Sequence, residues 1–128
     1  MLIFEDAVNK AVAAHLLACG YTGVNYLVGN SRGRDVSGVC PKTGRTLVVE
    51  SKGEARTGSQ LARSWNNVAS ALLTALNEKY GSKNTDAAIA LPHTVEYPGR
   101  MEPLRPFLSE QKITVFWVRE DEVSDIWI

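Results

Sequence analysis

The chain has 128 residues, a formal net charge of zero and a hydrophobic fraction of 45%, ordinary values for a soluble globular protein. We therefore expect residues 1–128 to form one domain whose core needs no disulfide or metal to hold it. No apolar run approaches the roughly 20 residues that span a bilayer, and the acidic start of the chain lacks the basic segment of a secretory signal. A cytoplasmic protein without a membrane partner is expected.

Positive charge is concentrated in one part of the chain. Between residues 32 and 64, seven basic residues stand against three acidic ones, whereas acidic residues prevail from 65 to 128. Such a concentration favours phosphate binding, although a solvated loop face would give the same count. The composition is therefore compatible with a nucleic-acid enzyme but does not establish one.

The first half of the chain predicts a helix followed by three strands. Apolar spacing indicates a helix over residues 3–19, ended by Gly20. A short strand is expected at Val24–Val28, and two more at Asp35–Cys40 and Arg45–Lys52, joined by a turn with proline early and glycine late. The cysteines, at positions 19 and 40, have no CxxC spacing and are interpreted as small buried hydrophobic residues.

The second half predicts a long amphipathic helix and two further strands. The helix is expected from Ser59, a plausible N-cap, to Tyr80. Its apolar stripe is expected to face the core and consists of Leu61, Trp65, Val68, Ala69, Leu72 and Leu76. A strand at Asp86–Leu91, a short helix within Met101–Glu110 and a strand at Ile113–Val118 follow. This order predicts an α/β fold, a central mixed sheet with helices on both faces.

Candidate catalytic residues lie on the two hairpin strands. Side chains two apart on a strand point the same way, so Glu50 and Lys52 share one face of the sheet. The apolar run at residues 46–49 predicts that this strand is largely buried. With the turn at residues 41–44, positions whose numbers sum to about 85 face each other, which places Asp35 opposite Glu50.

Two opposed carboxylates call for a cation between them. Their Cβ atoms would lie about 5 Å apart, and the like charges would repel. A hard divalent ion with oxygen ligands, Mg²⁺ above all, resolves that repulsion, and Mn²⁺ is expected to substitute. A second Glu-x-Lys, at residues 110–112, has no acidic partner on a hairpin and is interpreted as surface.

The motif has a family resemblance. Arg34-Asp35 and Glu50-Ser51-Lys52, on two hairpin strands after one helix and before a long one, resemble the PD-(D/E)xK nuclease superfamily. This group includes type II restriction enzymes, Holliday-junction resolvases and RecB-like nucleases. The resemblance extends over roughly residues 3–118 in element order, but its motif is short, and arginine stands where proline is usual. It implies a restriction-endonuclease-like core and metal-dependent DNA hydrolysis that leaves 5′-phosphate and 3′-hydroxyl ends.

The resemblance also implies roles for the motif residues. Asp35 and Glu50 would ligate Mg²⁺ together with the backbone carbonyl of Ser51. Lys52 would orient the attacking water and offset the charge that grows on the phosphate.

Further candidates flank this motif. Glu5 resembles a helical glutamate that some members add as an outer metal ligand, although an acidic residue is also favourable in any first helical turn. Gln60 resembles the glutamine of the following helix in RecB-like and resolvase-like members. Candidates for holding DNA phosphates, as opposed to ordinary surface arginines, are Arg32, Arg34, Arg56 and Arg63.

Two other classes of function stay open. The first is a catalytically silent nuclease-like module that binds nucleic acid or a partner protein. The second is a structural subunit that docks through the apolar end of its tail at Trp127. For the enzyme, the expected partner is DNA, including branched or single-stranded DNA. A domain this small leaves little surface for reading bases, so a homodimer or a larger nucleoprotein complex is also considered.

Overall fold

The structure is a computed structural model that describes residues 2–29 and 33–128. Six strands form one mixed sheet in the order β1-β2-β3-β4-β5-β6. The strands are β1 (Thr22–Tyr26), β2 (Val36–Val39), β3 (Thr46–Ser51), β4 (Thr85–Pro92), β5 (Thr114–Arg119) and β6 (Glu122–Trp127). Neighbours from β1 to β3 are antiparallel, β3, β4 and β5 are parallel, and β6 returns antiparallel to β5.

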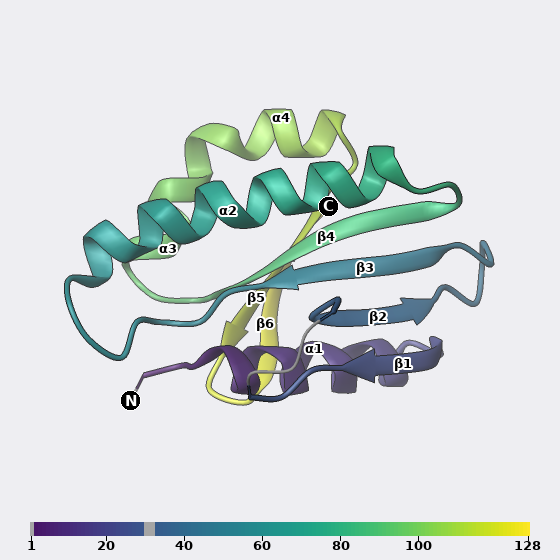
Figure 1. Cartoon of the computed structure of the whole chain (residues 1–128), viewed down its shortest axis with the longest axis horizontal. Coiled ribbons are helices and arrows are strands. Elements are labelled where there is room, and N and C mark those ends of the chain that lie inside the picture. The colour runs from purple at the N-terminus through teal and green to yellow at the C-terminus, as the bar shows by residue number, and fades with distance from the viewer. Residues whose placement is uncertain (1, 30–32) are drawn as a thin grey trace.

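Helices cover both faces of this sheet. They are α1 (Glu5–Ala18), α2 (Gln60–Gly81), α3 (Glu96–Met101), the 3-10 turn η1 (Glu102–Leu104) and α4 (Arg105–Glu110). In Figure 1, α1 lies on one side of the sheet, and α2, α3 and α4 lie together on the other. The predicted mixed α/β fold is confirmed. In the described part of the chain, no helix combines the length and apolar character needed to cross a bilayer.

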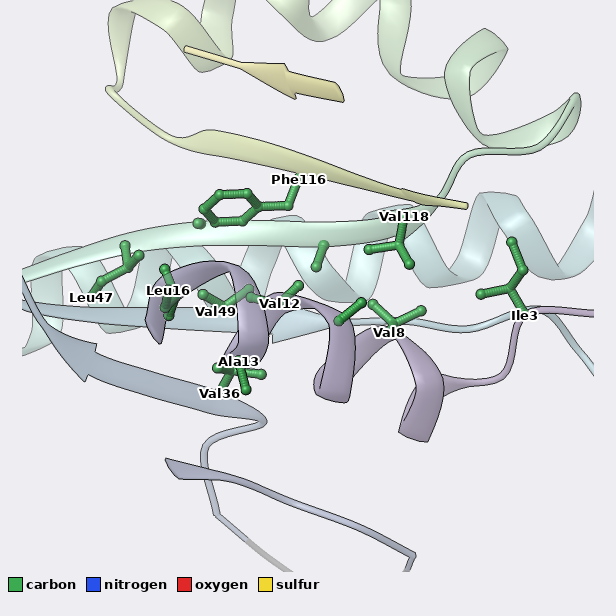
Figure 2. Packing of buried hydrophobic residues seen from close by; sticks show 13 residues of the cluster. Ile3, Val8, Val12, Ala13, Leu16, Val36, Leu47, Val49, Phe116 and Val118 are labelled. Carbon is green, nitrogen blue, oxygen red and sulfur yellow. The ribbon is translucent and has the colours of Figure 1, made fainter. Parts of the chain in front are cut away.

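Each face of the sheet has its own hydrophobic core. On the α1 side, apolar residues of the helix pack against alternate residues of β2 to β5, and Figure 2 shows this cluster. On the other side, α2, α3 and α4 pack against the intervening residues of β4 and β5. Phe116 belongs to the first core and Trp117 to the second, so neighbouring residues of β5 are buried on opposite faces of the sheet.

The predicted helix ends are confirmed by their capping contacts. Gly20 has φ +86°, and the N–H of Tyr21 donates to the Leu16 carbonyl, so a left-handed glycine closes α1. At the start of α2, the Ser59 hydroxyl accepts from the N–H of Ala62. The first strand begins two residues earlier than expected, since Thr22 already pairs with Val39 of β2. The pairing is irregular between Thr22 and Asn25, where Gly23 has φ +59°.

The tail of the chain is part of the core, which corrects one expectation. Residues from Glu122 onward form β6, and Trp127 is only 8% exposed. Its ring lies 5.0 Å from that of Trp117, edge to face, and the Arg105 guanidinium covers it. Because Trp127 is held inside the fold, it is unsuited to the docking role considered above.

The buried side of α2 also differs from the predicted stripe. Small residues line its contact with the sheet, namely Ser64, Val68, Ala71 and Ala75. Leu61 and Trp65 are instead 60% and 58% exposed. Small side chains let the helix approach the sheet closely. Of the predicted stripe, Val68 is buried, Leu72 and Leu76 are partly buried against the same core, and Ala69 is exposed.

The cysteines were wrongly predicted as buried. Cys19 is exposed and Cys40 is half-buried, and both are free thiols. Each lies at the end of an element, Cys19 just after α1 and Cys40 just after β2, where the chain leaves the core for a turn.

Candidate active site

The hairpin register brings the three motif residues together. Val36 pairs with Val49 and Ser37 with Val48, so the predicted sum is confirmed, and the next position outward places Asp35 beside Glu50. The ammonium of Lys52 lies 3.6 Å from a carboxylate oxygen of Glu50. Asp35, Glu50 and Lys52 therefore meet where β2 begins and β3 ends.

The two carboxyl groups strongly affect each other. Burial raises the pKa of Glu50, the negative charge of Asp35 and a hydrogen bond between the two side chains raise it further, and Lys52 opposes this, for a value of about 7. Without another cation, the Glu50 carboxyl therefore carries a proton for part of the time near neutral pH.

Backbone geometry adds a third oxygen on the same side. The N–H of Ser51 donates to a carboxylate oxygen of Asp35 at 2.9 Å, whereas the N–H of Lys52 donates in the opposite direction, to Ala90 of β4 at 3.0 Å. Because the N–H and C=O of one strand residue point the same way, the Ser51 carbonyl faces the side of Asp35. The Ser51 carbonyl and the Asp35 carboxylate therefore lie on the same side of β3.

Glu5 approaches this cluster from α1. Burial is the first cause that raises its pKa, the negative charge of Asp35 is the second, and Lys52 acts in the opposite direction. Its position depends on Gly53, since a Cβ there would lie 2.2 Å from the backbone nitrogen of Glu5. The missing side chain lets the segment after β3 pass directly against the start of α1.

A cleft of about 500 Å³ opens beside Lys52 and Glu5. Arg56 and Arg63 line it, together with Asn67 of α2. The Arg56 guanidinium lies 3.8 Å above the ring of Phe4, which holds it at the cleft wall. Two of the four predicted phosphate-binding arginines therefore lie next to the candidate catalytic lysine.

The other predicted residues lie elsewhere. Both amide atoms of Gln60 bond the backbone of Ala55, at 2.7 and 3.0 Å, so this side chain fixes the loop before α2. Arg34 forms an ion pair of 3.1 Å with Glu78 of α2. Arg32 lies outside the described residues.

The second Glu-x-Lys is on the surface, as predicted. Glu110 and Lys112 are exposed, between α4 and β5. The histidines make structural contacts: His15 packs edge to face on Phe116, and His93 bonds the hydroxyl of Ser124 at 2.7 Å.

Within residues 2–29 and 33–128, no three His, Cys, Asp or Glu side chains gather closely enough to hold a metal by themselves. Any ion between Asp35 and Glu50 would therefore take its other ligands from the Ser51 carbonyl and from water. Mg²⁺ accepts this, because it usually keeps several waters and uses only one or two carboxylates.

Three residues around the site were not predicted. They are Gly53, Asn67 and Tyr97. Asn67 carried no signal because a polar residue on a helix is usually solvated, and Tyr97 lies in α3, a helix that was not expected.

Fold and cluster together define an α/β domain in which Asp35, Glu50 and Lys52 meet at the end of β3. Two crystal structures are similar to it. One is an fdxN element excision controlling factor protein from Anabaena variabilis, 12% identical over 98% of both chains, with a TM-score of 0.61. The other is an XisH family protein from Nostoc punctiforme, 13% identical over 96% of this chain and 100% of that one, with a TM-score of 0.57. At such identities the likeness shows the fold alone.

Comparisons of the sequence gave no further relative. No protein-family model and no curated protein matches this chain.

Proposed function

We propose that this chain is a Mg²⁺-dependent endonuclease that hydrolyses DNA phosphodiester bonds through Asp35, Glu50 and Lys52. The observation that carries the proposal is the meeting of two carboxyl groups across β2 and β3 with an ammonium beside them. Opposed like charges destabilise a sheet. A bound cation would remove this repulsion, and folding alone does not account for the arrangement.

The residues present fit a magnesium ion. The Asp35 and Glu50 carboxylates and the Ser51 carbonyl would hold it, and all three are oxygen donors of the kind that hard cations prefer. When bound, the ion would activate a water and polarise a phosphoryl oxygen. The raised pKa of Glu50 supports the assignment, because a cation would replace the proton on Glu50 and relieve the repulsion.

In this proposal the chain's own cations act on the phosphate. Lys52 lies at the cleft, where its ammonium donates to the attacking water and offsets charge that grows on the phosphate oxygens. Arg56 and Arg63 hold the flanking phosphates along the same cleft. Gln60 keeps the loop that carries Arg56 in place through Ala55, and Glu5 bonds water in the outer shell of the site.

The alternative is a nuclease-like module that binds DNA or a partner protein without cutting. Its support is the similarity to the fdxN element excision controlling factor protein. The complete Asp, Glu and Lys set favours the enzyme, since a module that only binds has no use for an ammonium beside two opposed carboxylates.

The test is cleavage of DNA by the purified chain. Plasmid, single-stranded and branched DNA are incubated with Mg²⁺, Mn²⁺ or EDTA, beside Lys52→Ala and the matched control Lys83→Ala, which removes an exposed lysine just before β4. We expect cutting with either metal, none with EDTA, loss in Lys52→Ala and no change in Lys83→Ala. No cutting of any substrate, or full activity in Lys52→Ala, would refute the enzyme; DNA binding without cutting would support the module.

A further inference from the structure

We propose that Tyr97 and Asn67 are positioning residues, which hold the backbone after Lys52 so that its ammonium stays beside Glu50. This inference rests on the proposed function, since it assigns a task to residues that support that site. Neither side chain needs to touch the substrate to act in this way.

The two side chains and the Gly53 carbonyl form a closed ring of hydrogen bonds. The Tyr97 hydroxyl donates to the carbonyl at 3.1 Å. The Asn67 amide donates to the same carbonyl at 3.3 Å and to the Tyr97 hydroxyl at 2.8 Å. The ring therefore ties the residue after Lys52 to both α2 and α3.

The same short segment is fixed on two other sides. The N–H of Lys52 donates to Ala90 of β4 at 3.0 Å, and the N–H of Glu54 donates to the Ile3 carbonyl at 2.7 Å. The Glu54 carboxylate in turn accepts a hydrogen bond from the N–H of Ile3 at 3.0 Å. Lys52 thus leaves the sheet on a backbone held by β4, by the start of the chain and by the helical layer.

Of these contacts, the hydrogen bond from Tyr97 of α3 to the Gly53 carbonyl is the one that packing alone does not explain. Tyr97 is only 1% exposed, and burial raises the pKa of its phenol above the usual range, so the hydroxyl keeps its proton and acts as a donor at neutral pH. A core position filled by Phe would pack equally well. Because a buried hydroxyl must be satisfied, its placement on the Gly53 carbonyl indicates that this backbone is held for a reason other than packing.

The consequence is mechanistic. A lysine has a long flexible side chain, so its ammonium is placed only as well as its backbone is. Misplacing a catalytic group by about 1 Å can cost up to about 100-fold in rate. Loss of these hydrogen bonds to the Gly53 carbonyl should therefore lower the rate of the chemical step and leave DNA binding in the cleft unchanged.

The test compares two matched pairs of variants. Tyr97→Phe is set beside Tyr80→Phe, which removes the hydroxyl that bonds Gln111 near the far end of α2. Asn67→Ala is set beside Asn66→Ala, the exposed neighbour. We expect Tyr97→Phe and Asn67→Ala to lower kcat about 10-fold or more, with KM for DNA within about two-fold, and both controls to match the parent chain.

The double variant of Tyr97→Phe and Asn67→Ala should have a kcat only slightly below that of the more damaging single variant, because both side chains act on one carbonyl. Unchanged kcat in Tyr97→Phe and Asn67→Ala would overturn the proposal, as would a rise in KM alone. If the parent chain cuts no DNA, the proposed function has failed. In that case, amide hydrogen exchange at Glu54 tests whether Tyr97 holds the backbone after Lys52. Exchange about 10-fold faster in Tyr97→Phe than in Tyr80→Phe supports it, and equal exchange overturns it.

Discussion

The two ends of β3 carry their charges differently. At its start, Arg45 pairs with Asp86 at 3.1 Å, and the two side chains are 41% and 39% exposed. At its end, the Lys52 and Glu50 side chains are 21% and 18% exposed, and the nearby carboxylates outnumber the ammonium.

A balanced, exposed pair is an ordinary surface feature of small energetic value. A half-buried excess of negative charge destabilises the protein unless something else binds there. The proposed functional end of β3 is therefore the one whose charges the fold leaves uncompensated.

The largest expected effect separates the two aspartates. Asp35→Ala removes one proposed metal ligand and the acceptor of the Ser51 N–H, so DNA cleavage should fall at least about 100-fold. Asp86→Ala breaks only the exposed pair with Arg45, and its cleavage rate should stay within about two-fold of the parent. Initial rates with saturating Mg²⁺ provide the measurement, and equal losses in the two variants would erase the distinction between the ends.

The next effect concerns the glycine beside the acidic end. Gly53→Ala places a methyl group against the backbone of Phe4 and Glu5, and such overpacking costs about 1–3 kcal/mol. It should also lower activity about 10-fold, because the start of α1 must shift. The control is Gly99→Ala in α3, where an added Cβ meets nothing within 4 Å. Urea unfolding and cleavage rates measure both, and a tolerated Gly53→Ala would contradict the close approach.

A smaller effect is the dependence of stability on pH. The pKa of Glu50 is raised from 4.5 to about 7, so between these values the folded chain keeps a proton that the unfolded chain has lost. In EDTA, the free energy of unfolding should therefore contain a contribution that is present below pH 4.5 and is lost as the pH rises through about 7.

Glu50→Gln should remove this loss of unfolding free energy at rising pH. At pH 8 in EDTA it should be more stable than the parent by on the order of 1 kcal/mol, a figure reduced for the solvent screening of a half-buried group. Asp86→Gln, at the exposed end, should bring no such gain. Thermal unfolding from pH 4 to 8 distinguishes these outcomes, and a Glu50→Gln protein that is less stable at pH 8 would contradict the repulsion.

The smallest expected effect is on DNA affinity. Arg56→Gln or Arg63→Gln should weaken binding a few-fold and reduce the slope of log K against log salt by about one. Lys83→Gln removes the same charge at the opposite end of β4 and should leave the slope unchanged. Titrations of labelled DNA in EDTA at several salt concentrations measure this, and equal slopes in all variants would remove the arginines from the binding face.

Local patterns were enough to predict five of the six strands and the meeting of Asp35, Glu50 and Lys52. Strand alternation placed Glu50 and Lys52 on one face, and the turn length fixed the register that brings Asp35 to them. Both depend on neighbours in the chain or on one hairpin, so they can be read from residue order.

Contacts between distant elements could not be predicted in this way. The rotation of α2, which exposes Trp65, is set by the small residues that meet the sheet, and the burial of Trp127 depends on a sixth strand that its acidic sequence did not suggest. The ring that joins Gly53, Asn67 and Tyr97 combines three segments. Polar residues of this kind have no periodicity, so only the folded arrangement reveals them.

The central claim is that Asp35 and Glu50 form a cation site, and anomalous scattering from a crystal grown with Mn²⁺ tests it most directly. We predict one ion between the two carboxylates, with the Ser51 carbonyl among its ligands, and no ion in Asp35→Ala. Crystals with no ion at a Mn²⁺ concentration that supports cleavage, or with one bound only away from both carboxylates, would contradict it.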